Sequence, residues 1–295
     1  KLEGQEQLAE QIRGAVFAAS KDYAGSIAAF RRAYDVAPSK VQPMITLVRS
    51  YLLAGKTGEA MDFLGSVIQA SPDNVTALLL LGELEAANAN NTEAVQRFEQ
   101  VISLQPQNTA GYTNLANLRM REGHTDAAEQ VVGRGLLAVP GNFDLLMAQA
   151  SIYEVSSRFE EAIAAYEALL KKYPGSDVVV NNLASLLSEH RTDQASLLRA
   201  YEMTQRFNRS DAPYFKDTLG WASYRLGKVE EALPLIESAV RQLPAQPVFR
   251  YHLGVSYAAL NRKELARQEL EKALELSQDN TLQSTEQIRR ALESL

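Results

Sequence analysis

The chain has 295 residues, of which 46% are hydrophobic and 22% are charged, so it can bury a sizeable core. Its formal net charge is −6, which argues against a general nucleic-acid binder, because such a protein needs a basic face. The absence of cysteine excludes disulfides, thiolate metal sites and a cysteine nucleophile. The longest apolar run, Ala77–Gly82, is too short to cross a bilayer, so we expect no direct membrane span.

Prolines mark a regular interval along the chain. They stand 34 residues apart at Pro38, Pro72, Pro106, Pro140 and Pro174. The following steps are 36 residues to Ser210, 34 to Pro244 and 34 to Gln278. Self-similarity at a fixed period predicts a repeat protein.

Small and bulky residues keep the same period. One column of small residues predicts a close approach of two helices and contains Gly82, Ala116, Ala150, Ala184, Gly220 and Gly254. A second small column contains Ala60, Ala94, Ala128, Ala162, Ala232 and Ala266, and four residues beyond it stand Leu64, Phe98, Val132, Tyr166, Ile236 and Leu270. Between the two patterns lie Gly55, Gly123, Gly227 and Asn261, where a helix end favours a left-handed residue. Each period therefore predicts a helix, a tight turn, a second helix and a proline that stops it.

This pattern resembles the tetratricopeptide repeat family, through Leu219-Gly220, Tyr224, Ala232, Ala239 and Pro244 and their equivalents elsewhere. The resemblance covers roughly residues 7–280 and implies an all-α fold, a right-handed superhelical solenoid of about eight helix-turn-helix repeats within residues 1–280. We expect the repeats at about 7–40, 41–74, 75–108, 109–142, 143–176, 177–212, 213–246 and 247–280. Residues 281–295 are expected to form a capping helix, because Ile288, Leu292 and Leu295 share one stripe.

Two departures from the family pattern are local. The early tryptophan that is frequent in the family is replaced by Met44, Leu78, Tyr112, Leu146, Val180, Lys216 and Arg250. The sixth repeat carries two extra residues near Ser188–Ala195. We expect them to lengthen the turn at His190–Gln194, because a loop absorbs an insertion more easily than a packed helix does.

The single tryptophan lies on the first helix of the seventh repeat. Leu219, Ala222 and Leu226 form the packed stripe of that helix, whereas Asp217, Trp221, Tyr224 and Arg225 follow a different stripe. The family resemblance implies that this second stripe lines the concave groove, where extended partners lie.

We therefore expect Trp221, Tyr224, Arg225 and Tyr251 to form one exposed patch with Asp217 at its edge, a composition enriched at binding hot spots. The alternative, that Trp221 packs between repeats, stays open. Further along the groove, Asn117, Arg121 and Asn181 are expected to contribute polar partner contacts.

Catalytic and phosphate-binding motifs find no support. Gly55-Lys56-Thr57 lacks the second glycine of a phosphate loop, since Ser50 stands at that position. We expect His124 and His190 to be solvated turn residues, and no H-E-x-x-H pair or G-x-S-x-G motif occurs. We therefore expect no enzyme, no cofactor and no metal site. Only Asn117 and Arg121 match part of the carboxylate clamp of co-chaperone repeats, so a heat-shock tail is not expected as the partner.

The expected function is that of a non-catalytic scaffold whose groove binds a peptide or protein. Asn181–Leu187, Asp217–Leu235 and Phe249–Leu276 resemble bacterial proteins of envelope polysaccharide export, including the lipoprotein type paired with PEP-CTERM sorting systems. That resemblance implies a place in the cell envelope or periplasm, with the cytoplasm as the alternative. A second function stays open: the substrate-recognition region of a glycosyltransferase-like enzyme whose catalytic domain would follow Leu295, although the expected capping helix argues against it. The sequence does not predict an oligomeric state.

Overall fold

The computed structural model describes the backbone of residues 2–277 and 282–295 and the side chains of residues 5–277 and 285–295. Throughout these residues every regular element is a helix. The expected periodic position Gln278 and the first residue of the expected capping helix, residue 281, lie outside them. The chain divides into two compact units, Lys1–Ile152 and Tyr153–Leu295, which we call the N-terminal and C-terminal units.

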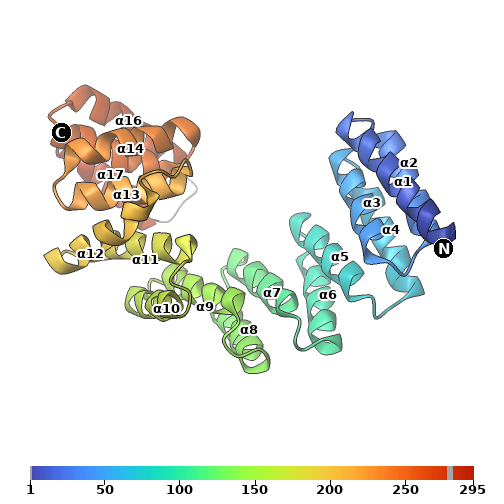
Figure 1. The fold of residues 1–295 in the computed structure, drawn as a ribbon. Coiled ribbons are helices and arrows are strands. Elements are labelled where there is room, and N and C mark those ends of the chain that lie inside the picture. The colour runs from blue at the N-terminus through green and yellow to red at the C-terminus, as the bar shows by residue number, and fades with distance from the viewer. Residues whose placement is uncertain (1, 278–281) are drawn as a thin grey trace. The chain divides into compact units, whose positions relative to one another are not determined.

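The N-terminal unit is a series of antiparallel helix pairs (Figure 1). Its helices are α1 (Leu2–Ala19), α2 (Tyr23–Val36), α3 (Val41–Leu53), α4 (Thr57–Ala70), α5 (Val75–Ala87), α6 (Asn91–Leu104), α7 (Thr109–Arg121), α8 (Thr125–Ala138) and most of α9 (Phe143–Val155). The second helix of one pair packs against the first helix of the next, as α2 does against α3 and α4 against α5.

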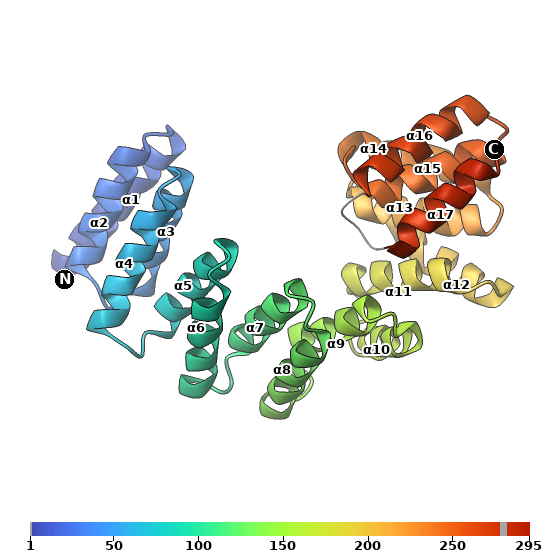
Figure 2. The same ribbon diagram turned by 180° about the vertical axis from the view of Figure 1, so that it is seen from behind.

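The C-terminal unit continues the pattern with α10 (Phe159–Lys172), α11 (Asp177–His190), α12 (Gln194–Thr204), the 3₁₀ turn η1 (Gln205–Phe207), α13 (Pro213–Arg225), α14 (Val229–Gln242), α15 (Pro247–Ala259), α16 (Lys263–Leu276) and α17 (Leu282–Glu293). Figure 2 shows α13 to α17 gathered together at the C-terminal end. Ile288 of α17 is buried against Leu270 and Ala273 of α16, and Leu292 and Leu295 pack beside it.

A left-handed residue closes the first helix of most repeats, as predicted. Gly55, Gly123, Gly227 and Asn261 have φ angles of 71°, 78°, 80° and 56°. Lys21, Ala89 and Ser157 adopt the same conformation at the equivalent positions, although each carries a Cβ atom. The turn compensates for that strain by satisfying carbonyls at the helix end: the Asn90 N–H, for example, donates to the Glu85 oxygen at 2.8 Å.

The predicted close approach of the two helices is confirmed. A Cβ atom at Gly220 would lie 2.6 Å from Ile236 Cγ1, and one at Gly254 would lie 2.6 Å from Leu270 Cγ. Ala60, Ala94, Ala128, Ala162, Ala232 and Ala266 of the second small column are all fully buried, as are the bulky residues that follow them. Leu219, which was expected in the packed stripe, is buried, and so is Leu253, the equivalent residue of the next repeat.

The sixth repeat accommodates its two extra residues differently from the expectation. Its turn, residues 191–193, has the same length as the turn between α3 and α4, so the predicted lengthening at His190–Gln194 was wrong. Instead α11 has 14 residues where α9 has 13, and α12 ends after 11 residues in the turn η1. Phe207 of η1 remains buried and stacks on Phe215 at 4.4 Å, which keeps the shortened helix joined to the next repeat.

Substituting Gly220 by alanine should lower the free energy of unfolding by about 1–3 kcal/mol, because the new methyl group meets Ile236 and the Ala232 carbonyl 3.2 Å away. Gly133→Ala is the matched control: its Cβ atom would meet no atom within 4 Å inside α8, so stability should rise by about 0.5–1 kcal/mol. Urea denaturation measures both. A stabilising Gly220→Ala would contradict the close approach of α13 and α14.

Candidate functional site

Four aromatic rings gather between α13 and α15 in the C-terminal unit. Trp221 lies nearly parallel to Tyr224 on one side, with ring centroids 4.9 Å apart, and to His252 on the other, at 4.0 Å. Tyr251 is tilted against Trp221 at 6.1 Å. Because Trp221 is only 5% exposed, its indole lies within this aromatic cluster.

The His252 imidazole lies between two carboxylates and contacts both. Its Nδ1 lies 2.9 Å from Asp217 Oδ2, and its Nε2 lies 3.1 Å from Glu189 Oε1. An ionised carboxylate can only accept hydrogen bonds, so each ring nitrogen must carry a hydrogen and donate a hydrogen bond, and the imidazole is cationic. The three side chains come from α15, α13 and α11, and they therefore link the first helices of three successive repeats.

The environment of His252 favours its protonated form. Burial by itself would lower the pKa of His252, but the charges of Asp217 and Glu189 and their hydrogen bonds outweigh it and raise the pKa to about 9. Burial also raises the pKa of Glu189, and the hydrogen bond and charge of His252 outweigh that effect, so its pKa lies below the ordinary value. We call Glu189, Asp217 and His252 the buried charge cluster; Asp217 and His252 are buried, and Glu189 is half-buried at its edge.

Arg225 ties the same region to the end of α11. Its guanidinium donates to the carbonyl of Ser188 and, at 2.9 Å, to that of Arg191. These carbonyls lie at the C-terminal end of the helix, where a cation is favourable. The guanidinium also lies 5.8 Å from the Trp221 ring centroid. Arg225 is therefore engaged within the protein.

The structure corrects the expected exposed patch. It brings Asp217, Trp221, Tyr224, Arg225 and Tyr251 together, but Trp221 and Asp217 are buried and the other three are half-buried. The alternative that Trp221 packs between repeats describes what the structure shows. Its Nε1–H is buried and has no hydrogen-bond partner.

Sequence reasoning missed His252 and Glu189. Both side chains sit at helix positions that look ordinary on one helix, because their partners lie 35 and 63 residues away in the chain. A usable signal was present: the positions equivalent to 252 in the two preceding repeats carry the polar residues Asn182 and Thr218 on a helix face that packs.

The other two histidines differ from each other. His124 lies in the turn before α8 and is exposed, as predicted. His190 is exposed too, but it is the last residue of α11 and stacks on Phe159 at 3.5 Å, so its placement in a turn was wrong.

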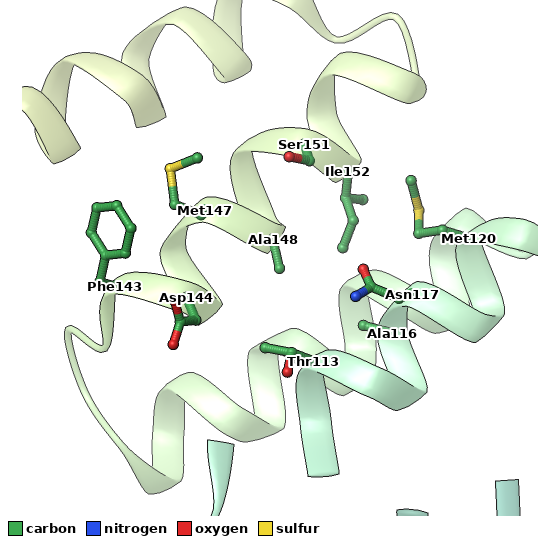
Figure 3. Close-up of a pocket in the computed structure, with 10 residues that line it drawn as sticks. All are labelled: Thr113, Ala116, Asn117, Met120, Phe143, Asp144, Met147, Ala148, Ser151 and Ile152. Atoms are coloured by element: carbon green, nitrogen blue, oxygen red, sulfur yellow. The ribbon is translucent and has the colours of Figure 1, made fainter. Parts of the chain in front are cut away.

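An open pocket lies between α7 and α9 in the N-terminal unit (Figure 3). Its volume is about 510 Å³, and it is lined by Thr113, Ala116, Asn117, Met120, Phe143, Asp144, Met147, Ala148, Ser151 and Ile152. Figure 3 shows Asn117 and Ala148 facing each other across the two helices, with Met120 and Met147 at the rim. The thioethers are flexible and polarizable and adapt to varied apolar groups, whereas the Asn117 amide can both donate and accept a hydrogen bond.

The pocket lies at the repeat positions that carry aromatic and charged side chains in the C-terminal unit. By repeat position, Asn117 corresponds to Trp221, Thr113 to Asp217, Met120 to Tyr224, Met147 to Tyr251 and Ala148 to His252. Small and flexible residues thus replace large aromatic and charged ones. The same face is closed between the seventh and eighth repeats and hollow between the fourth and fifth.

The other residues predicted to contact a partner, Asn117, Arg121 and Asn181, do not come together in one site. Asn117 is exposed and lines the pocket, and Arg121 is exposed on the last turn of α7. Asn181 is half-buried on α11, where its Nδ2 donates to Asn182 Oδ1 at 3.3 Å and its Oδ1 is buried without a partner. Of the predicted site residues, Asn117 alone lines the pocket.

Within the described residues, no group of three histidine, aspartate or glutamate side chains has a geometry that could hold a metal ion. No helix in this part of the chain combines the length and the apolar composition needed to cross a bilayer.

Family models described as tetratricopeptide repeat match residues 76–108, 113–177 and 218–281. Anaphase-promoting complex subunit 7 of Arabidopsis thaliana is 25% identical over 59% of this chain and 31% of its own length. The TPR repeat-containing protein PA4667 of Pseudomonas aeruginosa is 24% identical over 55% of this chain and 27% of its own length. This chain therefore spans about a third of these curated relatives.

Solved structures share the fold. A tetratricopeptide repeat protein from Parabacteroides merdae superposes with a TM-score of 0.54 at 15% identity, covering 98% of both chains. The Cut9–Hcn1 hetero-tetramer of the APC/C has a TM-score of 0.65 at 13% identity, covering 92% of this chain and 52% of the matched chain. At these identities the similarity shows an all-α solenoid of helix pairs.

The buried charge cluster predicts a loss of stability at alkaline pH. The pKa of His252 rises from 6.5 to about 9 on folding, so the folded chain holds the proton more tightly. The resulting stabilisation, on the order of 3 kcal/mol, is fully present below pH 6.5 and is lost as the pH rises through 9. Urea denaturation from pH 6 to 10 should show this decline in the wild type and a flatter profile in His252→Gln. Parallel profiles would mean that His252 is not charged in the fold.

Trp221→Ala should lower the free energy of unfolding by about 3–5 kcal/mol, because the buried indole packs between Tyr224 and His252. Tyr214→Ala is the control, since that aromatic residue on the same helix is 51% exposed. Thermal melting distinguishes the two. A Trp221→Ala protein as stable as Tyr214→Ala would return the tryptophan to the surface.

Proposed function

Because the chain belongs to the tetratricopeptide repeat family, we propose that it is a non-catalytic scaffold whose open pocket between α7 and α9 binds a protein partner as an extended segment. The observation that carries this proposal is the hollow face itself. Its volume of about 510 Å³ lies within the range of typical ligand pockets, and its wall combines apolar side chains with a few polar ones.

The chemistry of the pocket indicates what it accepts. Met120, Met147 and Phe143 offer apolar contact to an aliphatic or aromatic side chain, while Asn117 can pair with the donor and acceptor of one peptide unit. The carboxylate of Asp144 lies exposed at the same wall and favours a cationic group beside the apolar one. The fitting partner is therefore an extended segment with a large apolar residue next to a lysine or arginine.

The equivalence of Asn117 and Trp221 gives a direct test. Peptides selected from a random displayed library against the whole chain should share an apolar residue beside a basic one, and calorimetry measures their affinity. Asn117→Trp should weaken binding at least about tenfold, because the indole would occupy the space that it fills at position 221. Gln130→Trp, at an exposed position of α8, should leave affinity unchanged.

Helicity and melting temperature of both variants should match the wild type, since position 117 is exposed. Peptides that bind Asn117→Trp as tightly as the wild type would place the binding surface elsewhere. Failure to select any peptide with saturable affinity would count against the proposed function itself.

We further propose that this scaffold works in the bacterial cell envelope, in polysaccharide or protein export. The proposal rests on the resemblance of Asn181–Leu187, Asp217–Leu235 and Phe249–Leu276 to proteins of that system. Fractionation of the producing cells tests it, with recovery in the periplasmic or membrane fraction as the expected result. Recovery with a cytosolic marker would contradict the envelope location and leave the binding function intact.

A further inference from the structure

The first helix presents an unusually apolar exposed face. Leu8, Ile12 and Val16 are 54%, 57% and 63% exposed, and Ala9, Ala15 and Ala19 are exposed beside them. These six residues, which we call the α1 seam, fall on one side of the helix, and no charged residue lies among them. A solvent-facing helix ordinarily carries charged or polar residues on that side.

In later repeats the preceding repeat covers the positions equivalent to Ala9, Ile12 and Val16, whereas positions equivalent to Leu8, such as Val178 and Val248, stay exposed. Ser50, equivalent to Val16, hydrogen bonds through its hydroxyl to Ser26 of the preceding second helix at 2.9 Å. Gly111, equivalent to Ala9, lies so close to the preceding α6 that a Cβ atom would be 3.0 Å from Val101 and Ile102. His252, equivalent to Ile12, contacts Asp217 of the preceding first helix. Ala9, Ile12 and Val16 therefore belong to a repeat-stacking face that the described residues leave exposed, and Leu8, Ala15 and Ala19 extend its apolar surface along one edge.

The sequence of the seam is complementary to itself. When two copies of α1 run antiparallel, so that the two residue numbers at each level add to 27, Leu8 of one copy faces Ala19 of the other and Ile12 faces Ala15. Each large side chain then meets a small one, which lets two helices interlock closely. The same register places Glu6 at the level of Lys21, with opposite charges at both ends of the contact.

We propose that the α1 seam packs against the α1 seam of a second copy of this chain, antiparallel about a twofold axis. A twofold contact repeats every pairing, so each dimer contains two Leu8–Ala19 and two Ile12–Ala15 contacts. The twofold contact brings no like charges together at the seam, because it carries none. This interface involves α1 alone and does not depend on the pocket between α7 and α9.

Sedimentation velocity of the whole chain over a range of concentrations tests the proposal, with a reversible monomer–dimer equilibrium as the expected result. Ile12→Glu should shift that equilibrium at least about a hundredfold towards monomer, because it places two carboxylates in an apolar contact. Leu137→Glu is the control: it adds the same charge at an apolar position that is 85% exposed on α8, and it should leave the dimer unchanged. A wild-type chain that remains monomeric up to roughly 100 μM, where even a weak interface would form, would overturn the proposal.

A size exchange tests the register. Ile12→Ala leaves a gap opposite Ala15, and Ala15→Ile sets two isoleucines against each other, so each variant alone should dimerise at least about tenfold more weakly. Mixing the two variants restores one large and one small residue at both contacts, and a heterodimer with near wild-type affinity should form. Both positions are exposed in the single chain, so circular dichroism should show unchanged folding. Dimerisation that is insensitive to these changes, or a mixture no tighter than the single variants, would overturn the antiparallel α1 contact.

Discussion

Close contact between a small residue on one helix and a bulky residue on the next holds each repeat together. Gly220 and Gly254 lie against Ile236 and Leu270 so tightly that no additional methyl group fits. This contact fixes how the two helices of a pair cross, and the crossing decides which side of the first helix meets the preceding repeat. The stacking faces and the open faces of both units follow from it.

Between repeats the contacts are more varied than within them. Most stacking faces are apolar, with Leu118, Ile152 and Leu186 buried at the same repeat position. The C-terminal repeats add the buried charge cluster, in which one imidazolium holds two carboxylates from different helices. Burying ions costs more free energy than burying carbon, but an ion pair satisfied from several sides demands one arrangement of its partners. The cluster therefore specifies the stacking of α11, α13 and α15.

The sequence predicts the structural features that recur every 34 residues. It does not predict contacts between side chains of different repeats. The helix pairs, the left-handed turn residues and the small columns follow from local propensity and the 34-residue period, and the structure has them where expected. The burial of Trp221 depends on His252, which lies one repeat further along the chain. The stripe on a single helix shows only that Trp221 points away from its own partner helix. It does not show whether the neighbouring repeat supplies a side chain large enough to cover it.

The same reasoning explains why the hollow face lies in the fourth and fifth repeats. The place that Asp217, Trp221 and His252 fill is taken there by Thr113, Asn117 and Ala148. Thr113 and Ala148 cannot form an ion pair, so no cluster of charges draws the side chains inward between these helices. With no aromatic ring on top, Met120 and Met147 stand at the rim of an open pocket. The position of Trp221 thus contributes to stability in the C-terminal unit, and the equivalent position of Asn117 leaves room for a partner in the N-terminal unit. The residue opposite it in the next repeat, His252 or Ala148, decides between these two outcomes.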